Sequence, residues 1–459
     1  MQKFVYIPTN LYMANVIKLR KGLDINLQGK AAEELGNVKP SEIYGLVPDG
    51  FYGVKPKVVV KEGDMVKAGD ALFVNKLHPD VKFVSPVSGK VTGVVRGERR
   101  KVLSVQVAAD SQQTYKDFGK KSPDSMSSEQ VKSALLESGM FAFFRQRPYD
   151  VCANPDDTPK AIFISAFSDM PLASNFGFVV KGNEADFQTG IDALAKIANV
   201  YLGIPKNSAL ASVKNAKVNV FDGPCPAGNV GVQINHVSPI NKGEIVWTIG
   251  PEEVIFIGRL FNNGVADFTR TIAVAGSEIS KPCYVKVKVG QQIASIIEEN
   301  QKKADHNVRI IAGNPLVGVK VSKDDFLLAH TTEITSIPEG DDNNEAFGWI
   351  LPRFNQLSTN RSYCSWLMGK KEYNLDARVK GGERHMIMSG EYDKVFPMDI
   401  YAEYLVKAII AGDIDRMEAL GIYEVAPEDF AVAEFVDSSK LELQRIVREG
   451  LDNLKKENE

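Results

Sequence analysis

The region from Val58 to Val107 alternates apolar and polar side chains, which is the spacing of half-buried β-strands. Two Gly-Asp pairs, at 63–64 and 69–70, interrupt the alternation. Such pairs form tight turns, because glycine accepts a positive φ and aspartate bonds to its neighbouring backbone. A further turn lies between Pro86 and Gly89, after which the alternation resumes. The pattern predicts a small domain of short strands over residues 16–110, either a barrel or a sandwich.

The two halves of this region resemble the barrel-sandwich domain of lipoyl- and biotin-carrying enzymes. Those domains present a modified lysine at the tip of a hairpin between the halves. Counting back from Pro86 puts His78 at the tip. Counting forward from Gly63 puts Pro79 there, and Lys76 is out of register by both counts. Because neither histidine nor proline forms an amide with lipoate or biotin, we expect a lipoyl/biotinyl-like fold with no covalently bound cofactor.

Beyond a polar linker at 110–130, apolar runs alternate with helical patterns. Residues 161–167 form a continuous apolar run, as expected of a strand covered on both faces. An apolar stripe predicts a helix at 187–201. Further strands are predicted at 218–221 and 253–257, with a helix at 229–234. Alternating strands and helices are typical of a parallel sheet, so we expect a Rossmann-like α/β domain over residues 128–258.

The pattern changes after this region. Residues 270–276 predict a strand that ends in a turn, and residues 281–290 alternate as in a hairpin with one solvated face. A short helix is predicted at 291–300, and strands at 309–312 and 317–321. This is the element order of a β-grasp (ubiquitin-like) domain, which we place at residues 259–330.

The last part of the chain, residues 331–459, is predicted to be mostly helical. Asp399 is a candidate cap for the helix that carries Tyr404 and Ile409. Residues 439–442 have the pattern of a capping box. The helix that they open carries Leu443, Val447 and other apolar residues on one face, which is expected to pack on the protein.

Length, charge and residue composition exclude several classes of function. A chain of 459 residues holds about three or four domains, and a net charge of −3 gives no sign of a nucleic-acid partner. No apolar run approaches the ~20 residues that cross a bilayer, and residues 1–15 lack the pattern of a secretory signal. For work at a membrane, another protein would therefore have to hold this chain there. The scattered cysteines and histidines lack metal-ligand spacing, so no metal site is expected: Cys152, Cys225, Cys283, Cys364, His78, His236, His306, His330 and His385.

Several motifs follow one another in a distinctive order. They are IKLRKGLDI at 17–25, VKFVSPVSG at 81–89, GPCPAGNVG at 223–231, RTIAVAG at 270–276, and GERHMIMSG at 382–390, followed by Tyr392 and residues 396–400. The ordered set resembles the A-type subunits of the sodium-translocating NADH:quinone reductase (Na+-NQR) over residues 16–455. Related architectures occur in Rnf-type electron-transport subunits and in the flavin-binding subunit of respiratory complex I.

The resemblance implies a peripheral subunit on the cytoplasmic face of the bacterial inner membrane. Its complex couples NADH oxidation and quinone reduction to sodium export. The implied partners are the other subunits of that complex, above all an integral membrane subunit, and quinone. FMN or FAD, riboflavin and a 2Fe-2S cluster are expected on the partner subunits.

The sequence departs from these relatives at two cofactor sites. The complex I relative binds flavin on a glycine-rich loop, where backbone N–H groups approach a phosphate. The corresponding stretch here, 138–145, keeps only Gly139 and fills the loop with aromatic residues. Cys364 stands alone where relatives carry a four-cysteine cluster motif. The turns at 181–183 and 228–231 also lack a dinucleotide fingerprint, so we expect this chain to bind no flavin, cluster or nucleotide.

The same stretch is the candidate quinone site. Aromatic rings beside guanidinium groups suit a flat ring with carbonyl oxygens. The candidate residues are Gly139, Phe141, Phe143, Phe144, Arg145 and Arg147. The alternative is a helix face packed in the core, with solvated arginines.

No catalytic residue is assigned. Residues 383–386, Glu-Arg-His-Met, are either acid–base machinery or a structural or interface segment. The favoured hypothesis is a subunit that forms part of the quinone site or its contact with a membrane subunit. The alternatives are a cofactor-free assembly scaffold and an Rnf-type electron-transport subunit.

Overall fold

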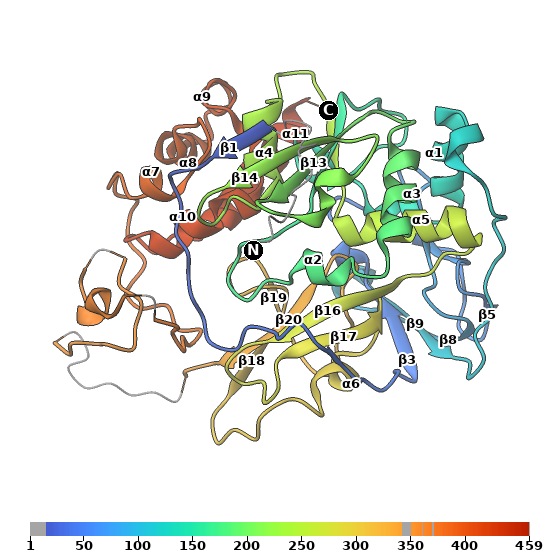
Figure 1. Ribbon diagram of the computed structural model, residues 1–459, viewed down its shortest axis with the longest axis horizontal. Helices are drawn as coiled ribbons and strands as arrows, with labels where there is room; N and C mark the ends of the chain where they lie inside the picture. The colour runs from blue at the N-terminus through green and yellow to red at the C-terminus, as the bar shows by residue number, and fades with distance from the viewer. Residues whose placement is uncertain (1–14, 342–349, 360, 370, 459) are drawn as a thin grey trace, which may run out of the picture.

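The computed structural model describes residues 15–341, 350–359, 361–369 and 371–458. Its N-terminal part is a barrel-sandwich of two small sheets, with strand orders β3-β9-β8-β5 and β4-β6-β7 (Figure 1). His78 and Pro79 lie in the connection between β6 and β7, so the predicted hairpin tip is confirmed. The strands are β3 (Ile43–Leu46), β4 (Pro56–Val58), β5 (Met65–Val66), β6 (Ala71–Asn75), β7 (Lys82–Val84), β8 (Gly89–Arg96) and β9 (Val102–Ala109).

The central layer is a seven-stranded sheet of order β1-β14-β13-β12-β15-β10-β11. Its first five strands in this order run parallel, and β10 and β11 are antiparallel additions at one edge. The predicted strand at 161–167 is confirmed as β12, which is buried on both faces. The strands are β1 (Asn15–Lys18), β10 (Arg145–Arg147), β11 (Val151–Cys152), β12 (Ala161–Ser165), β13 (Asn199–Pro205), β14 (Lys217–Asp222) and β15 (Val246–Thr248).

Helices cover the faces of this sheet, and α3 packs along α5 (Figure 1). The helix predicted at 229–234 is confirmed as α4, whereas the one predicted at 187–201 ends early and gives way to β13. The helices are α1 (Ser128–Glu137), α2 (Phe176–Val179), α3 (Glu184–Leu194), α4 (Val230–Val237) and α5 (Pro251–Asn263).

The strand predicted at 253–257 is wrong, because these residues lie in α5. Short apolar runs do not distinguish a buried strand from a buried helix. The residues at the two ends favour a helix. Pro251 occupies the first turn, where Glu252 and Glu253 interact favourably with the positive end of the helix dipole. Gly264 ends the helix with a φ of 76°.

A six-stranded sheet follows, of order β19-β18-β20-β16-β17-β2. The predicted hairpin is confirmed as the antiparallel pair β16–β17. β20, which the sequence pattern did not predict, pairs in parallel with β16 and antiparallel with β18. The elements are β2 (Leu35–Gly36), β16 (Thr269–Ala275), β17 (Cys283–Lys288), α6 (Ile293–Ile297), β18 (Val308–Ala312), β19 (Val319–Val321) and β20 (Glu333–Pro338).

The C-terminal part is helical, and α11 buries the predicted apolar face, including Leu443 and Val447. Both predicted caps are wrong. α8 begins after Tyr401 rather than at Asp399, and the Ser439 hydroxyl accepts a hydrogen bond from Ile387 N at 3.2 Å. The helices are α7 (Tyr392–Val395), α8 (Ala402–Ala411), α9 (Ile414–Ala419), α10 (Ala431–Val436) and α11 (Leu443–Asn458). Within the described ranges, every helix is too short or too polar to span a bilayer.

Candidate quinone-facing segment and its ion-pair networks

The candidate segment lies where three parts of the fold meet. Gly139 ends the turn after α1 at φ 77°, and residues Met140–Phe143 form a short 3-10 helix that leads into β10. A Cβ atom at Gly139 would lie 2.8 Å from both methyl groups of Val84. Glycine is therefore required here by backbone conformation and by close approach to the barrel.

The three phenylalanines of the segment are core residues, each at most 4% exposed. The rings of Phe141 and Phe144 lie 5.3 Å and 5.6 Å from that of Trp247, in edge-on contacts. Phe143 lies 5.9 Å from Phe51 of the barrel and 5.6 Å from the ring of His330. The cluster therefore joins the barrel, the seven-stranded sheet and the residues that precede β20.

Little empty space adjoins these rings. A cavity of about 10 Å³ is lined by Phe143, Gly139 and neighbours from the barrel, including Phe51 and Val84. This volume admits about one water molecule. A quinone ring would have to displace side chains to enter it.

Arg147 is held in a buried ion-pair network. Its side chain is 1% exposed, and its Nη1 and Nη2 donate to Asp429 Oδ2 and Glu428 Oε1, both at 3.0 Å. Burial opposes the charged form, but Asp429, Asp150 and Glu428 together raise the pKa of Arg147. These two ion pairs connect β10 to the 3-10 helix Pro427–Phe430. They offset the cost of burying the charge of Arg147.

Arg145 differs from the other candidates because its side chain is 39% exposed. Its Nη1 lies 3.9 Å from Asp150 Oδ1. Burial would raise the pKa of Asp150, but Arg145, Arg147 and Arg448 lower it, so this carboxylate stays charged. Of the candidate residues, Arg145 is the one that meets solvent with a cation.

A second buried network lies beside Phe143, and the sequence did not predict it. Arg270 donates from Nε to Glu252 Oε2 at 2.6 Å and from Nη2 to Glu253 Oε1 at 3.1 Å. His330 Nδ1 lies 3.7 Å from Glu253 Oε1. A signal was present, because Glu252 and Glu253 follow a proline directly after an apolar strand, which is a helix start.

Glu252 and Glu253 both accept hydrogen bonds from Arg270, but their pKa values shift in opposite directions. Burial raises the pKa of Glu252 to about 7, with the adjacent Glu253 adding to the rise. Burial also opposes charge on Glu253, but Arg270 and His330 lower its pKa to about 2. Two like charges on one partner repel, so Glu252 takes up a proton as pH falls through about 7, whereas Glu253 stays charged. The Oε1 atom of Glu252 has no hydrogen-bond partner within the described structure.

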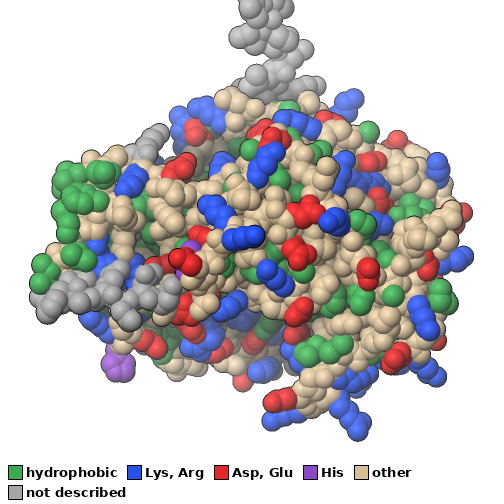
Figure 2. Space-filling model, turned by 90° about the horizontal axis from the view of Figure 1, so that it is seen from below, with side chains coloured by type: hydrophobic (Ala, Val, Ile, Leu, Met, Phe, Trp, Pro, Cys, Tyr) green, Lys and Arg blue, Asp and Glu red, His purple; other side chains and the backbone are tan. Residues whose placement is uncertain are grey.

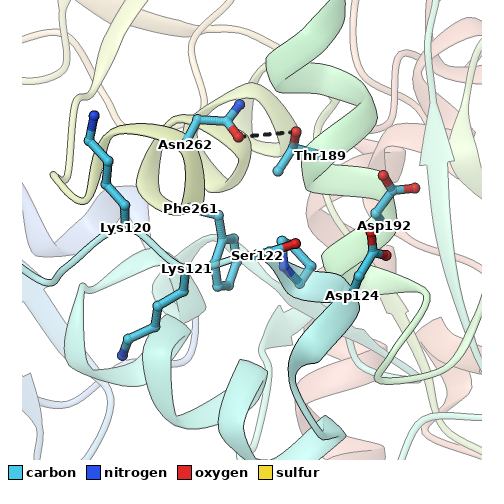
Figure 3. Close-up of a pocket in the computed structure, with 9 residues that line it drawn as sticks. Lys120, Lys121, Ser122, Asp124, Thr189, Asp192, Phe261 and Asn262 are labelled. Atoms are coloured by element: carbon cyan, nitrogen blue, oxygen red, sulfur yellow. Dashed lines mark hydrogen bonds between the residues drawn. The ribbon is translucent and has the colours of Figure 1, made fainter.

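Two surface hollows lie outside this segment. Figure 3 shows one of about 340 Å³ between the linker residues Lys120–Asp124 and helices α3 and α5, where Thr189 Oγ1 bonds to Asn262 at 3.3 Å. The other, of about 850 Å³, runs beside α8 and is lined by residues 383–386. None of the candidate quinone residues lines either hollow.

Metal ligands do not converge anywhere in the described ranges: no three His, Cys, Asp or Glu side chains are arranged to hold an ion. The four cysteines are free thiols. Burial raises the pKa of Cys152 to about 12, so this thiol is not a nucleophile at neutral pH.

The fold is that of a multidomain α/β protein with an N-terminal barrel-sandwich and C-terminal helices. Three family models match the chain: "NqrA N-terminal barrel-sandwich hybrid domain" over 17–110, "NqrA second alpha/beta domain" over 126–266, and "NQRA C-terminal domain" over 271–323. The chain belongs to the NqrA family of the Na(+)-translocating NADH-quinone reductase, as the ordered motifs implied.

Curated relatives from this family match almost the whole chain. The NqrA protein from Hahella chejuensis is 34% identical over 449 residues, covering 96% of this chain and 100% of the relative. Those from Yersinia pestis bv. Antiqua and Haemophilus influenzae are 32% and 33% identical, with the same coverage. Among solved structures, an NAD+-reducing [NiFe]-hydrogenase in the air-oxidized state is 12% identical with a TM-score of 0.34, covering 48% of each chain.

Proposed function

We propose that this chain is the peripheral subunit of a sodium-translocating NADH:quinone reductase, docked at the cytoplasmic face of the inner membrane on an integral membrane subunit. The observation that carries the proposal is 32–34% identity over the full length of relatives named as parts of that reductase. NADH oxidation, the flavins and the 2Fe-2S cluster then belong to the partner subunits, because this chain lacks the glycine-rich loop and the cysteine motif.

The same proposal extends to the domains. We assign a lipoyl/biotinyl-like barrel to residues 16–110, a Rossmann-like domain to 128–258, a β-grasp domain to 259–330 and a helical domain to 331–459. Strands from outside the second and third ranges complete their sheets: β1 pairs with β14 of the second domain, and β20 pairs with β16 and β18 of the third. The parallel order of β14, β13, β12 and β15 supports the second assignment, and the β16–β17 hairpin followed by α6 supports the third.

Within this role, the 139–147 segment is proposed to support a quinone-facing surface through Arg145. Its partly exposed guanidinium can donate to a quinone carbonyl, because such a group is a donor only and remains charged. Gly139, Phe141, Phe143, Phe144 and Arg147 would act by positioning, since all of them are buried. In this proposal Arg145 contacts the quinone, and the five buried residues hold Arg145 in position.

The test uses the complete complex, purified through an affinity tag on this chain. Arg145→Ala should raise KM for quinone about tenfold or more, which corresponds to a lost charged hydrogen bond of about 1.5–3 kcal/mol. Oxidation of NADH by an artificial acceptor should stay normal. Arg96→Ala, a change at an exposed arginine on β8, is the matched control. An unchanged quinone KM in Arg145→Ala removes the segment from the quinone site.

A cofactor-free scaffold is the second candidate, favoured by the burial of Arg147 in ion pairs and by the small cavity beside Phe143. The fluorescence of Trp247 can distinguish a quinone-binding subunit from a scaffold, because its ring contacts Phe141 and Phe144. Quinone bound to the isolated chain should quench its emission, and Trp247→Phe should remove the response. No quenching would favour the scaffold. Bound flavin or iron–sulfur absorbance in the isolated chain would favour an Rnf-type subunit.

A further inference from the structure

A small lobe built from residues 350–359, 361–369 and 371 exposes large apolar side chains. We call it the 350–371 lobe. It projects from the rest of the fold at the lower left of Figure 1, and apolar side chains gather at that edge in Figure 2. The side chains are each between 45% and 63% exposed: Ile350, Leu351, Phe354, Trp366, Leu367 and Met368.

Hydrogen bonds hold the two arms of the lobe together. Cys364 N donates to Pro352 O at 3.0 Å, and Lys371 Nζ donates to Phe354 O at 3.0 Å. The apolar residues of the first arm and those of the 3-10 helix Cys364–Met368 therefore belong to one unit. The unit is fixed to the body by Tyr373, which is buried and donates from its backbone N to Asn26 O at 2.8 Å.

The charge of the lobe has one sign. The residues that make up the lobe include Arg353, Arg361 and Lys371 and no Asp or Glu. The Arg361 guanidinium lies 5.0 Å from the ring centre of Trp366. Cations beside exposed aromatic and aliphatic groups are typical of segments that rest in the headgroup region of a membrane.

We propose that the 350–371 lobe binds an anionic lipid surface, with its apolar side chains entering the boundary between headgroups and acyl chains. The charge favours lipid phosphates over a neutral partner, and the exposed Trp, Phe, Leu, Ile and Met side chains suit an interface without fixed shape. The inference rests on the peripheral location under the proposed function. It adds a direct lipid contact to attachment through a membrane subunit.

The test is sedimentation of the full chain with protein-free vesicles, either phosphatidylcholine alone or an equimolar mixture with phosphatidylglycerol. The chain should bind the anionic vesicles, and high salt should weaken binding. Leu367→Glu should weaken it at least tenfold, and Arg361→Gln about fivefold, the factor for one interfacial cation. Leu77→Glu is the matched control, because Leu77 is similarly exposed on the barrel, and it should bind like the unaltered chain.

A second measurement reports insertion. Lipids brominated in the acyl chain should quench the emission of Trp366, and Trp366→Phe should remove most of that quenching. Absence of binding, equal binding by Leu367→Glu, or equal loss in Leu77→Glu would each overturn the proposal. So would a Leu367→Glu chain that binds vesicles normally but no longer co-purifies with its complex, which would assign the lobe to a protein contact. Because the vesicles contain no other protein, failure here leaves co-purification to judge the proposed function separately.

Discussion

Arg147 and Asp429 form a salt bridge across 282 residues of sequence, with Nη1 3.0 Å from Oδ2 and neither side chain more than 1% exposed. The pair joins β10 to the 3-10 helix Pro427–Phe430. The sequence offered Arg147 as a candidate quinone residue. In the structure its side chain links the central sheet to the C-terminal part of the chain. The consequences for stability and chemistry can be measured separately.

Removing Arg147 should destabilise the protein strongly. Arg147→Ala leaves Asp429 buried without its partner, which costs about 3–5 kcal/mol. Chemical unfolding followed by circular dichroism measures the loss. Arg445→Ala, which breaks exposed pairs with Glu442 and Glu449, should cost no more than about 1 kcal/mol. Equal effects of the two changes would contradict the assignment.

Phe144 should act through packing. Phe144→Ala should cost about 3–5 kcal/mol of unfolding free energy, because it empties a buried ring site beside Trp247. Phe144→Leu keeps most of the volume and should cost less than about 1.5 kcal/mol. Thermal unfolding measures both variants, with the exposed Phe354→Ala as control. If Phe144→Leu impaired quinone kinetics without loss of stability, a direct contact would be indicated instead.

Glu252 should make stability depend on pH. Its pKa is about 7 in the folded state, against an ordinary value of 4.5, so the folded state holds the proton more tightly. This contribution is fully present below pH 4.5 and is lost as pH rises to about 7. The total is on the order of 3 kcal/mol, at 1.36 kcal/mol for each unit of pKa. Glu252→Gln should therefore gain stability relative to the unaltered chain between about pH 5 and about pH 7.5.

Glu253→Gln is the matched control for that experiment. Its folded-state pKa is about 2, so its stabilising contribution is lost only as pH falls from 4.5 towards 2. Between about pH 5 and about pH 7.5 the difference from the unaltered chain should change less than for Glu252→Gln, because Glu252 is still present and loses only the part of its pKa rise that Glu253 adds. Urea unfolding at about pH 5 and about pH 7.5 gives the free energies of unfolding of both variants and of the unaltered chain. A difference for Glu252→Gln that stays constant over this pH range would contradict the raised pKa of Glu252.

Gly139 should tolerate substitution less well than another glycine of similar conformation. Gly139→Ala places a methyl group 2.8 Å from the Val84 side chain at φ 77°. Gly182 has φ 82° with nothing within 4 Å of a Cβ atom, so Gly182→Ala carries only the conformational cost of about 1–2 kcal/mol. Unfolding free energies should rank Gly139→Ala clearly below Gly182→Ala, and equal losses would contradict the steric argument.

Local patterns predicted many elements correctly. The Gly-Asp turns and alternating valines predicted the strands of the barrel, the run at 161–167 predicted β12, and the apolar face after Leu443 predicted α11. These features depend on side chains within a few residues of one another. The strand predicted at 253–257 is wrong for the same reason, because its apolar residues fit a buried strand and a buried helix equally well.

By itself, the sequence supplied the ordered motifs, which identified the family, and the patterns that predicted an N-terminal barrel-sandwich, α/β domains and C-terminal helices. It also offered an aromatic and basic stretch as a site. Only the tertiary structure decided that Phe141, Phe143 and Phe144 are core residues, that Arg147 belongs to Asp429 and Glu428, and that Arg145 meets solvent. The physical reason is that burial and charge pairing are properties of contacts between segments hundreds of residues apart, which no local spacing of residue types records.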